Sequence, residues 1–244
     1  MRRLFALVAV ATALCVLGVG TARAIVGGTL DNGAHPYAVL LKIARSDGSF
    51  ERCSGVLVNG TKVVTAAHCL DGATAVGVYF GGGPITTEAP DAFSTGWAIE
   101  PGYVGLDVKN KVDTHDLAVI SLDTSYTPST QAKVAPVGYT DMFAKKSTFT
   151  VVGFGIQSLK PLVQERTRYD ASSDLKNAKD PYNLRLAAKG GTACFGDSGG
   201  PVLDGDTAVA IVSFGQNDQC TSSFFAYRLD TAESRAFLAS QGAL

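Results

Sequence analysis

The sequence is poor in charge, in histidine and in cysteine. Only 18% of its 244 residues are charged, and 21 Lys and Arg offset 22 Asp and Glu to a formal net charge of −1. Because nucleic-acid binding requires Lys and Arg clustered against phosphate, this balance excludes that class of partner. The five cysteines form no Cys-x-x-Cys pair, and His68 beside Cys69 lacks the ligand spacing of a zinc site. We therefore expect no metal and no cofactor.

Long hydrophobic runs are also missing beyond the first 24 residues. Two arginines precede an apolar run from Leu4 to Gly20, and Ala22-Arg23-Ala24 fits the Ala-x-Ala pattern of signal-peptide cleavage. The run is shorter than the ~20 residues that span a bilayer, which disfavours an uncleaved anchor. We predict a signal peptide over residues 1–24 and a secreted, extracellular mature chain without membrane attachment. Losing the three leader arginines leaves 18 basic against 22 acidic residues, a formal charge of −4.

The cysteines that remain after leader removal are even in number. Cys15 leaves with the leader, and the mature chain keeps Cys53, Cys69, Cys194 and Cys220. An even number of cysteines in an exported chain indicates two disulfides. Four cysteines allow three pairings, of which the most local joins the first two and the last two.

Short apolar, β-branched runs between turn residues dominate the mature chain. They predict antiparallel β-structure of sandwich or barrel type. The clearest runs lie at residues 37–44, 62–69, 116–122, 147–155 and 207–215.

Two further segments differ from this pattern. The apolar spacing after Leu229, preceded by Asp230 or Thr231 as a cap, predicts a docked C-terminal helix. Residues 157–192 are polar and poor in strand pattern, so we expect long loops there.

The segment GDSGGP, residues 196–201, places Ser198 among glycines. Gly, Asp and Ser are ordinary turn residues, so a turn without chemistry is one interpretation. A second is the Gly-x-Ser-x-Gly nucleophile elbow of α/β-hydrolases, in which the histidine follows the serine. All three histidines precede Ser198, which excludes the elbow and allows the order histidine, acid, serine. The subtilisin-like order acid, histidine, serine would need a strand–helix alternation that this chain lacks.

His68 is the strongest candidate for a base that activates Ser198, although a lone histidine is more often part of a core. The other two are weaker, because His35 stands in a turn before a proline and His115 adjoins Asp116. Neighbours in an extended chain face opposite sides, so His115 and Asp116 cannot both point into one site. Asp116 itself is a solvated strand-end acid or a partly buried carboxylate that needs a partner, which an imidazole N–H would supply.

Six motifs in order carry a family resemblance across the mature chain. They are IVGG (25–28), TAAHC (65–69), DLAV (116–119), GFG (153–155), GDSGGP (196–201) and SFG (213–215). Together they resemble the trypsin/chymotrypsin family of serine proteases. The implied fold is all-β, with two packed six-stranded antiparallel β-barrels, besides the C-terminal helix. One protease domain would span residues 25–244, with its two halves meeting near 135–145.

The resemblance implies a secreted serine endopeptidase that acts through an acyl-enzyme. His68 and Asp116 would come from the first barrel and Ser198 from the second, as a catalytic triad. The backbone N–H groups of Gly196 and Ser198 would form the oxyanion hole. The resemblance also pairs Cys53 with Cys69 and Cys194 with Cys220.

In this family a freed N-terminal ammonium pairs with the aspartate before the nucleophile, here Ile25 and Asp197. The predicted leader ends directly before Ile25, so signal-peptide removal alone would activate the enzyme. An overhanging Ala24 would prevent the insertion.

The resemblance also locates a primary specificity pocket. Thr192 would form its floor, Ser213, Phe214 and Gly215 one wall, and Phe225 would fill part of it. Because a neutral floor leaves a buried substrate cation unpaired, we predict a preference for uncharged, small or medium apolar side chains.

Protein or peptide substrates, and proteinaceous protease inhibitors, are the expected partners of a monomeric enzyme. The alternative is a secreted binding protein on a protease scaffold, since a fold does not fix a function. Such proteins usually lose a triad member, and this chain keeps all three candidates.

Overall fold

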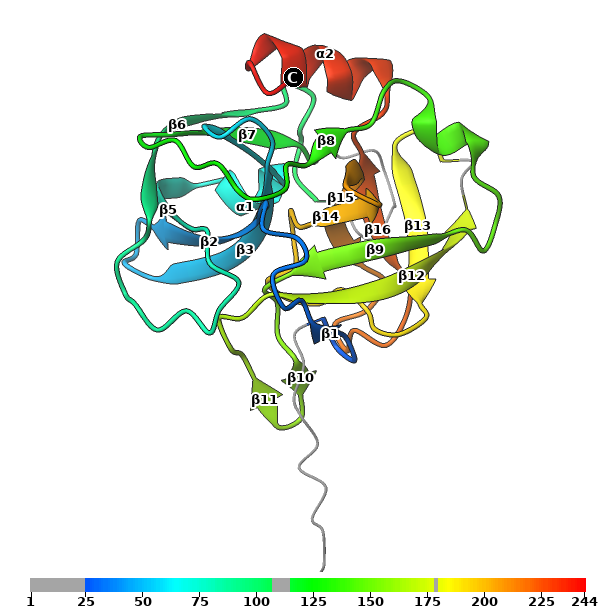
Figure 1. The fold of residues 1–244 in the computed structure, drawn as a ribbon, viewed down its shortest axis with the longest axis horizontal. Coiled ribbons are helices and arrows are strands. Elements are labelled where there is room, and N and C mark those ends of the chain that lie inside the picture. Colours follow the sequence, from blue (N-terminus) through cyan, green and yellow to red (C-terminus); the bar gives the residue numbers. More distant parts are fainter. Residues whose placement is uncertain (1–24, 107–114, 178–179) are drawn as a thin grey trace, which may run out of the picture.

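The computed structural model describes residues 25–106, 115–177 and 180–244 (Figure 1). The predicted leader at residues 1–24 lies outside this part of the chain. Within the described ranges, no helix is both long enough and apolar enough to cross a membrane.

The first half of the chain closes into a six-stranded antiparallel barrel. Its strands follow the order β2-β3-β4-β7-β6-β5. Val63 on β4 and Ile120 on β7 are paired on one face, and both are β-branched and buried in the core. The strands are β2 (Ala38–Arg45), β3 (Phe50–Leu57), β4 (Lys62–Thr65), β5 (Ala73–Tyr79), β6 (Ala92–Ile99) and β7 (Ala118–Leu122).

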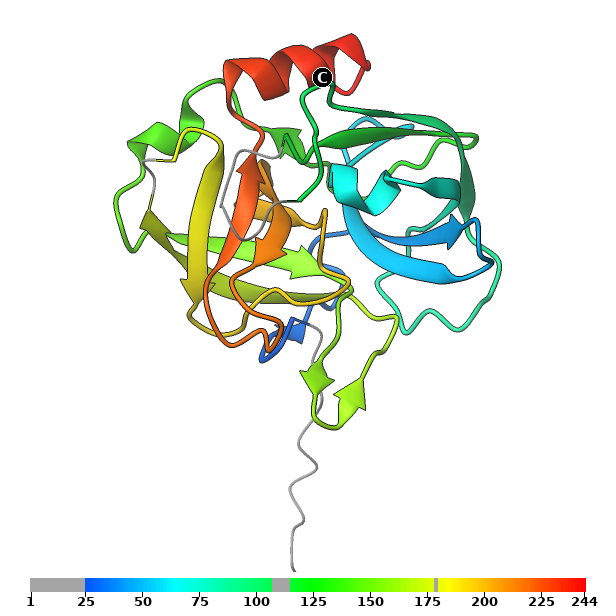
Figure 2. The same ribbon diagram turned by 180° about the vertical axis from the view of Figure 1, so that it is seen from behind.

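The second half forms another closed barrel, which lies beside the first in both ribbon views (Figures 1 and 2). Its ring runs β9-β12-β13-β16-β15-β14, and β14 pairs with β9 to close it. These strands are β9 (Thr148–Gly153), β12 (Tyr169–Asn177), β13 (Asn183–Ala188), β14 (Pro201–Asp204), β15 (Thr207–Gly215) and β16 (Phe224–Arg228). The two closed barrels confirm the predicted fold class.

Short elements fasten the two barrels together. Strand β1 (Thr29–Leu30) pairs with β12, and β8 (Lys133–Val134) runs parallel to β15. The remaining short elements are the hairpin β10 (Ser158–Leu159) and β11 (Leu162–Val163), the 3₁₀ turn η1 (Tyr139–Met142) and the single-turn helix α1 (Ala67–Leu70).

The predicted C-terminal helix is present as α2 (Ala232–Ser240), across the top of Figure 1. The Thr231 hydroxyl accepts a hydrogen bond from the Ser234 N–H at 3.0 Å, which caps the helix as expected. Phe237 and Leu238 are buried and belong to the same core cluster as the first barrel. The helix thereby packs the end of the chain against the core of the N-terminal half.

Two local expectations are wrong. Residues 157–192 contain β12 and β13 where we expected long loops. The inward side of β12 includes the small residues Ala171 and Ser173, and Ser172 and Lys176 face solvent, so the strand carries little hydrophobic signal. The strand expected over residues 62–69 ends at Thr65, and helix α1 follows it.

Candidate active site

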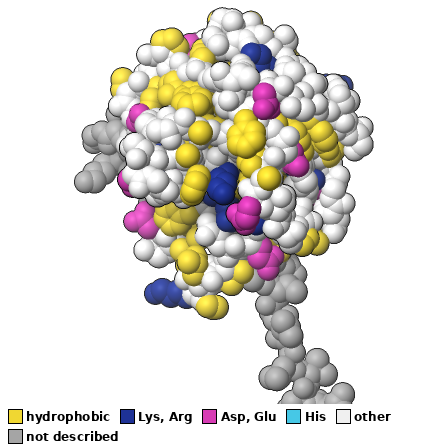
Figure 3. Space-filling model, turned by 90° about the vertical axis from the view of Figure 1, so that its left-hand side faces the viewer, with side chains coloured by type: hydrophobic (Ala, Val, Ile, Leu, Met, Phe, Trp, Pro, Cys, Tyr) yellow, Lys and Arg dark blue, Asp and Glu magenta, His cyan; other side chains and the backbone are white. Residues whose placement is uncertain are grey.

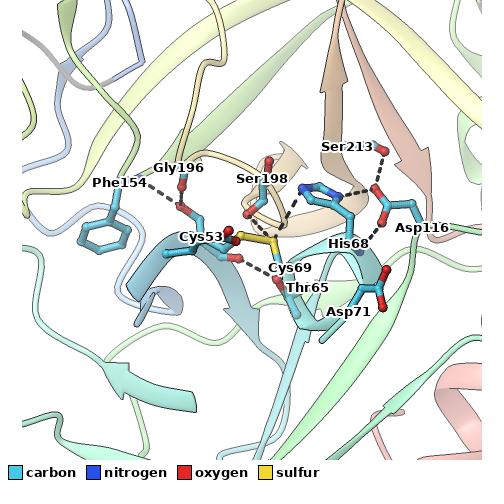
Figure 4. The surroundings of a disulfide bond; sticks show 12 residues. Cys53, Thr65, His68, Cys69, Asp71, Asp116, Phe154, Gly196, Ser198 and Ser213 are labelled. Carbon is cyan, nitrogen blue, oxygen red and sulfur yellow. Dashed lines mark hydrogen bonds and ion pairs between the residues drawn. A yellow bond between two sulfur atoms is a disulfide. The ribbon is translucent and has the colours of Figure 1, made fainter. Parts of the chain in front are cut away.

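His68 and Asp116 are held together by two hydrogen bonds (Figure 4). The His68 backbone N–H donates to Asp116 Oδ1, and ring Nδ1 lies 2.9 Å from Oδ2. A carboxylate can only accept, so Nδ1 carries the hydrogen and Nε2 of the neutral ring is left with a lone pair. Helix α1 makes this possible, because it turns the chain after β4 and directs the His68 amide toward Asp116, two residues before β7.

Asp116 is fully buried, and a third donor, the Ser213 hydroxyl, also reaches its Oδ2. Burial alone raises the pKa of this carboxyl. The charge that His68 carries when protonated, its hydrogen bonds and the bond from Ser213 outweigh burial and hold the pKa of Asp116 below its usual value. The site therefore contains a buried carboxylate whose charge is stabilised beside an imidazole.

Ser198 lies on a loop in which three positions require glycine. Gly196 and Gly199 have φ of +96° and +78°, in the left-handed region. A Cβ on Gly196 would stand 2.9 Å from Gly155 Cα, and one on Gly199 would stand 2.9 Å from the Ala66 nitrogen. A Cβ on Gly200 would come equally close to the Asp197 carbonyl oxygen. The GDSGGP motif is thus a loop packed directly against the backbone of both barrels.

His68 and Ser198 line one cavity of 310 Å³. In Figure 4 the His68 ring stands between Asp116 and Ser198, with Nδ1 toward the carboxylate. Among the described residues, Ser198 Oγ makes no hydrogen bond to His68, and Nε2 lies 3.8 Å from Cys69 Sγ. The backbone N–H groups of Gly196 and Ser198 donate to no acceptor within the described ranges.

Ser54 on β3 is a site residue that the sequence analysis missed. Its backbone N–H donates to the Ser198 carbonyl, and its hydroxyl donates to the Gly196 carbonyl, both at 2.8 Å. The same hydroxyl accepts the Phe154 N–H at 3.0 Å. Ser54 therefore anchors the nucleophile loop to the first barrel. Its position directly after Cys53 was the only signal in the sequence.

Asp197 is completely buried between two glycines of the GFG motif. Its carboxylate accepts the Gly155 N–H at 2.8 Å and the Cys194 N–H at 2.9 Å. A Cβ on Gly155 would stand 2.5 Å from the carboxyl carbon, so a side chain there would displace the acid. Burial, only partly offset by the two N–H donors, raises the pKa of Asp197 to about 7.

Ile25 is buried in the core of the second barrel. Val26 forms a β-bridge with Thr192, whose N–H donates to the Val26 carbonyl at 2.9 Å. Within the described ranges, no hydrogen bond or ion pair joins Ile25 to Asp197, and in this uncleaved chain the Ile25 nitrogen belongs to a peptide bond.

The cavity beside Ser198 holds only part of the expected specificity pocket. Ser213, Phe214 and Gly215 line it, together with Cys194, Val212 and Phe224. Thr192 and Phe225 are absent from its lining. The Thr192 hydroxyl donates to the Ser222 carbonyl at 3.2 Å, and the Phe225 ring stacks on Phe214 with centroids 4.8 Å apart.

The two disulfides join Cys53 to Cys69 and Cys194 to Cys220, with Cα separations of 6.3 and 5.4 Å. This confirms the predicted number and pairing. The first bond lies below the His68 ring and the second borders the cavity, so each stiffens one wall of the site (Figure 4).

The other two histidines have acidic partners away from Ser198. His35 Nδ1 contacts the Asp31 carboxylate, and His115 Nδ1 lies 2.8 Å from Glu100 Oε2. His115 and Asp116 thus face different neighbours as expected, although the backbone at His115 is left-handed (φ +45°) and not extended as the alternation argument assumed.

Comparisons with known proteins agree with this architecture. The family model described as Trypsin matches residues 25–232. Trypsin theta of Drosophila melanogaster is 31% identical over 198 residues, which cover 75% of this chain and 72% of that protein. Chymotrypsin of Phaedon cochleariae is 27% identical over 197 residues, covering 75% and 69% of the two chains.

Solved structures share the fold at lower identity. HL collagenase superposes with a TM-score of 0.72 at 21% identity, covering 89% of this chain and 99% of that chain. The scabies mite inactivated protease paralogue S-D1 has a TM-score of 0.73 at 16% identity, covering 90% and 99%. These two likenesses concern the fold alone.

Proposed function

The chain belongs to the trypsin family of serine proteases and is a serine endopeptidase, and on this premise we propose that His68, Asp116 and Ser198 are its catalytic triad. The observation that carries the proposal is the pair of hydrogen bonds from His68 to a buried Asp116, in the cavity that Ser198 also lines. Substrates of such an enzyme are proteins or peptides.

Each residue has a distinct role in the proposed mechanism. The Nε2 lone pair of His68 takes the Ser198 hydroxyl proton while Oγ attacks the peptide carbonyl carbon, and the imidazolium then returns that proton to the leaving amine. Asp116 fixes the tautomer and stabilises the imidazolium. Water then hydrolyses the acyl-enzyme by the same proton route. A small movement of the Ser198 hydroxyl toward Nε2 must precede the attack, since the two are not hydrogen-bonded before it.

The oxyanion hole would be formed by the Gly196 and Ser198 N–H groups. Both donors are without a protein acceptor in the described part of the chain, so they are available to the negative oxygen of the tetrahedral intermediate. Losing one such donor costs about 3–4 kcal/mol of barrier height. Asp197 lies between these two residues, so its position determines where both N–H groups point.

Activation by leader removal follows from the burial of Asp197. A carboxylate in this position without a cation is costly, and a freed Ile25 ammonium is the partner that the family uses. Ile25 already lies in the core of the same barrel, which supports insertion once the bond after Ala24 is cut. Two disulfides support secretion into an oxidising compartment.

For primary specificity, an apolar preference is supported by the hydrophobic lining of the cavity. Phe214, Val212 and Phe224 are among its apolar lining residues, and Asp218 is the one acidic side chain among the lining residues that the structure describes. Phe225, which we expected to fill part of the pocket, stacks on the lining residue Phe214.

Kinetics with the secreted chain test this function. Wild type should cleave casein and chromogenic peptides with an uncharged residue before the bond, whereas Ser198→Ala and His68→Ala should lose activity by about 10⁶-fold in kcat. A Ser198→Ala protein as active as wild type would remove Ser198 from the mechanism. Faster cleavage after Arg than after Leu would overturn only the specificity, and a secreted chain starting upstream of Ile25 would overturn activation by leader removal.

A further inference from the structure

Strand β3 leads outward from the nucleophile loop. Side chains two apart on a strand share a face, so Phe50, Arg52 and Ser54 point to one side. Ser54 hydrogen-bonds to the carbonyls of Gly196 and Ser198, and Arg52 Cδ lies 3.6 Å from where a Cβ of Gly196 would stand. The Arg52 side chain therefore passes directly beside the loop that carries the nucleophile.

Beyond the loop, Arg52 and Arg166 line a second cavity of 400 Å³, on the first barrel. Tyr79 and Gln164 contribute to its wall, and Lys42 stands at one side. Figure 3, which looks onto this barrel, shows basic side chains gathered next to acidic and hydrophobic ones in the middle of the face.

The acids around this cavity are already engaged. Glu88 lies 3.0 Å from Arg166 and 3.6 Å from Lys42, so one carboxylate, largely exposed, serves two cations. Glu51 pairs with Arg45. Within the described ranges Arg52 has no carboxylate partner, and its hydrogen bond is to the Glu165 carbonyl at 3.1 Å. Burial, and then the charge of Arg166, lowers the pKa of Arg52, as expected for a cation that lacks an anion.

The two cavities lie on either side of the nucleophile loop. Phe195 lines the cavity at Ser198, whereas the next residue, Gly196, faces Arg52. If the proposed function holds, the side chain before the cleaved bond occupies the first cavity, and the peptide must leave the site in the opposite direction. An extended peptide advances about 3.4 Å per residue, so the first few residues after the bond pass along β3.

We propose that Arg52, with Arg166 behind it, binds an acidic side chain of the substrate on the leaving-group side of the cleaved bond. The planar guanidinium of Arg52 can donate two parallel hydrogen bonds to one carboxylate, and none of its donors is held by an acid in the described part of the chain. This inference rests on the proposed function. It adds a preference for Glu or Asp within three residues after the bond.

Matched fluorogenic peptides test the preference. They share one sequence up to the cleaved bond and carry Glu, Gln or Lys at each of the next three positions in turn. For wild type we expect kcat/KM to be about tenfold higher for Glu than for Gln at one of these positions, and lowest for Lys, with the ratio falling at high salt. In Arg52→Gln the Glu-to-Gln ratio should fall to about one.

Two more variants keep the experiment decisive. Arg52→Lys retains the charge but cannot donate two parallel hydrogen bonds. Its Glu-to-Gln ratio should therefore lie between those of wild type and Arg52→Gln. This variant remains informative even if Arg52→Gln folds poorly. Lys189→Gln removes an exposed cation of the second barrel and should leave the ratio unchanged. Equal cleavage of all peptides by wild type, or an unchanged ratio in Arg52→Gln, would overturn the inference alone. Absence of cleavage of every peptide would instead count against the proposed function.

Discussion

The backbone amide and the ring of His68 both donate to Asp116, one to each carboxylate oxygen, and each hydrogen bond is 2.9 Å long. The two bonds fix the backbone and the side chain of His68 relative to one buried acid. The orientation of the imidazole is thus determined before any substrate binds.

Asp116→Asn should disturb the orientation of the imidazole without unfolding the protein. The amide can still fill the space, but its NH₂ group cannot accept the Nδ1 hydrogen, so the ring is driven to the wrong tautomer. We expect kcat to fall by about 10⁴-fold with little change in KM. Steady-state kinetics and a thermal unfolding curve check this, and a loss below tenfold in a folded protein would contradict the role of Asp116.

Gly155→Ala should inactivate the enzyme indirectly, through Asp197. The added Cβ would stand 2.5 Å from the carboxyl carbon of Asp197 and would displace the acid that positions the Gly196 and Ser198 amides. Gly81→Ala is the matched control, because its Cβ would meet nothing closer than 4.0 Å. We expect the first variant to lose at least about 100-fold in kcat and the second to match wild type. Equal activity of the two variants would show that Asp197 does not position the Gly196 and Ser198 amides.

The N-terminal segment should be destabilised by acid through Asp31. Burial raises the pKa of Asp31, but hydrogen bonds from His35 and Arg168, including one of 2.7 Å from Arg168 Nε, bring it to about 2. A lowered carboxyl pKa gives stability that is present above about pH 4 and lost as the pH falls through about 2. Asp31→Asn should therefore cost about 3–5 kcal/mol of unfolding free energy at pH 7 and progressively less below pH 4.

Urea unfolding in a Ser198→Ala background, which prevents self-digestion, measures this effect. Asp170→Asn removes a more exposed acid that Thr29 bonds at 2.7 Å, and it should cost less than about 1 kcal/mol. A pH-independent difference between wild type and Asp31→Asn would show that the ionised carboxylate is not what stabilises the segment.

One extra residue at the N-terminus should change how stability depends on pH. With Ala24 retained, burial keeps the pKa of Asp197 at about 7, so this group's contribution is full below about pH 4 and is lost as the pH rises through about 7. In a chain that starts at Ile25, the proposed ion pair with the free ammonium would instead hold Asp197 in its charged form. Unfolding curves of both chains in the Ser198→Ala background should therefore diverge between pH 4 and 7. Parallel curves would argue against the ion pair.

Much of the fold and the site was predictable because glycine, cysteine and histidine positions constrain the backbone strongly. The six motifs identified the family, the four cysteines indicated the two bonds, and the local settings of the three histidines favoured His68. Strands β12 and β13 were missed because short and polar residues such as Ala171 and Ser172 give no strand signal without their tertiary partners.

Part of the cavity wall could not be predicted for a related reason. A β-bulge between Val212 and Phe214 shifts their register against β16, and a shift of one residue exchanges the faces of a strand. Phe214 and Phe224 line the cavity, and the Phe225 ring stacks on Phe214. No residue pattern in the sequence predicts that bulge. The proximity of Arg52 to Gly196 was equally unpredictable, because the two are 144 positions apart in the chain.

Covalent labelling tests the central claim most directly. An organophosphonofluoridate should modify the mature enzyme once, and peptide mapping by mass spectrometry should place the phosphonyl group on Ser198, with slow labelling in His68→Ala and none in Ser198→Ala. Stoichiometric labelling of another residue with loss of activity, or an active enzyme that resists the reagent, would contradict a hydroxyl nucleophile activated by His68 and Asp116.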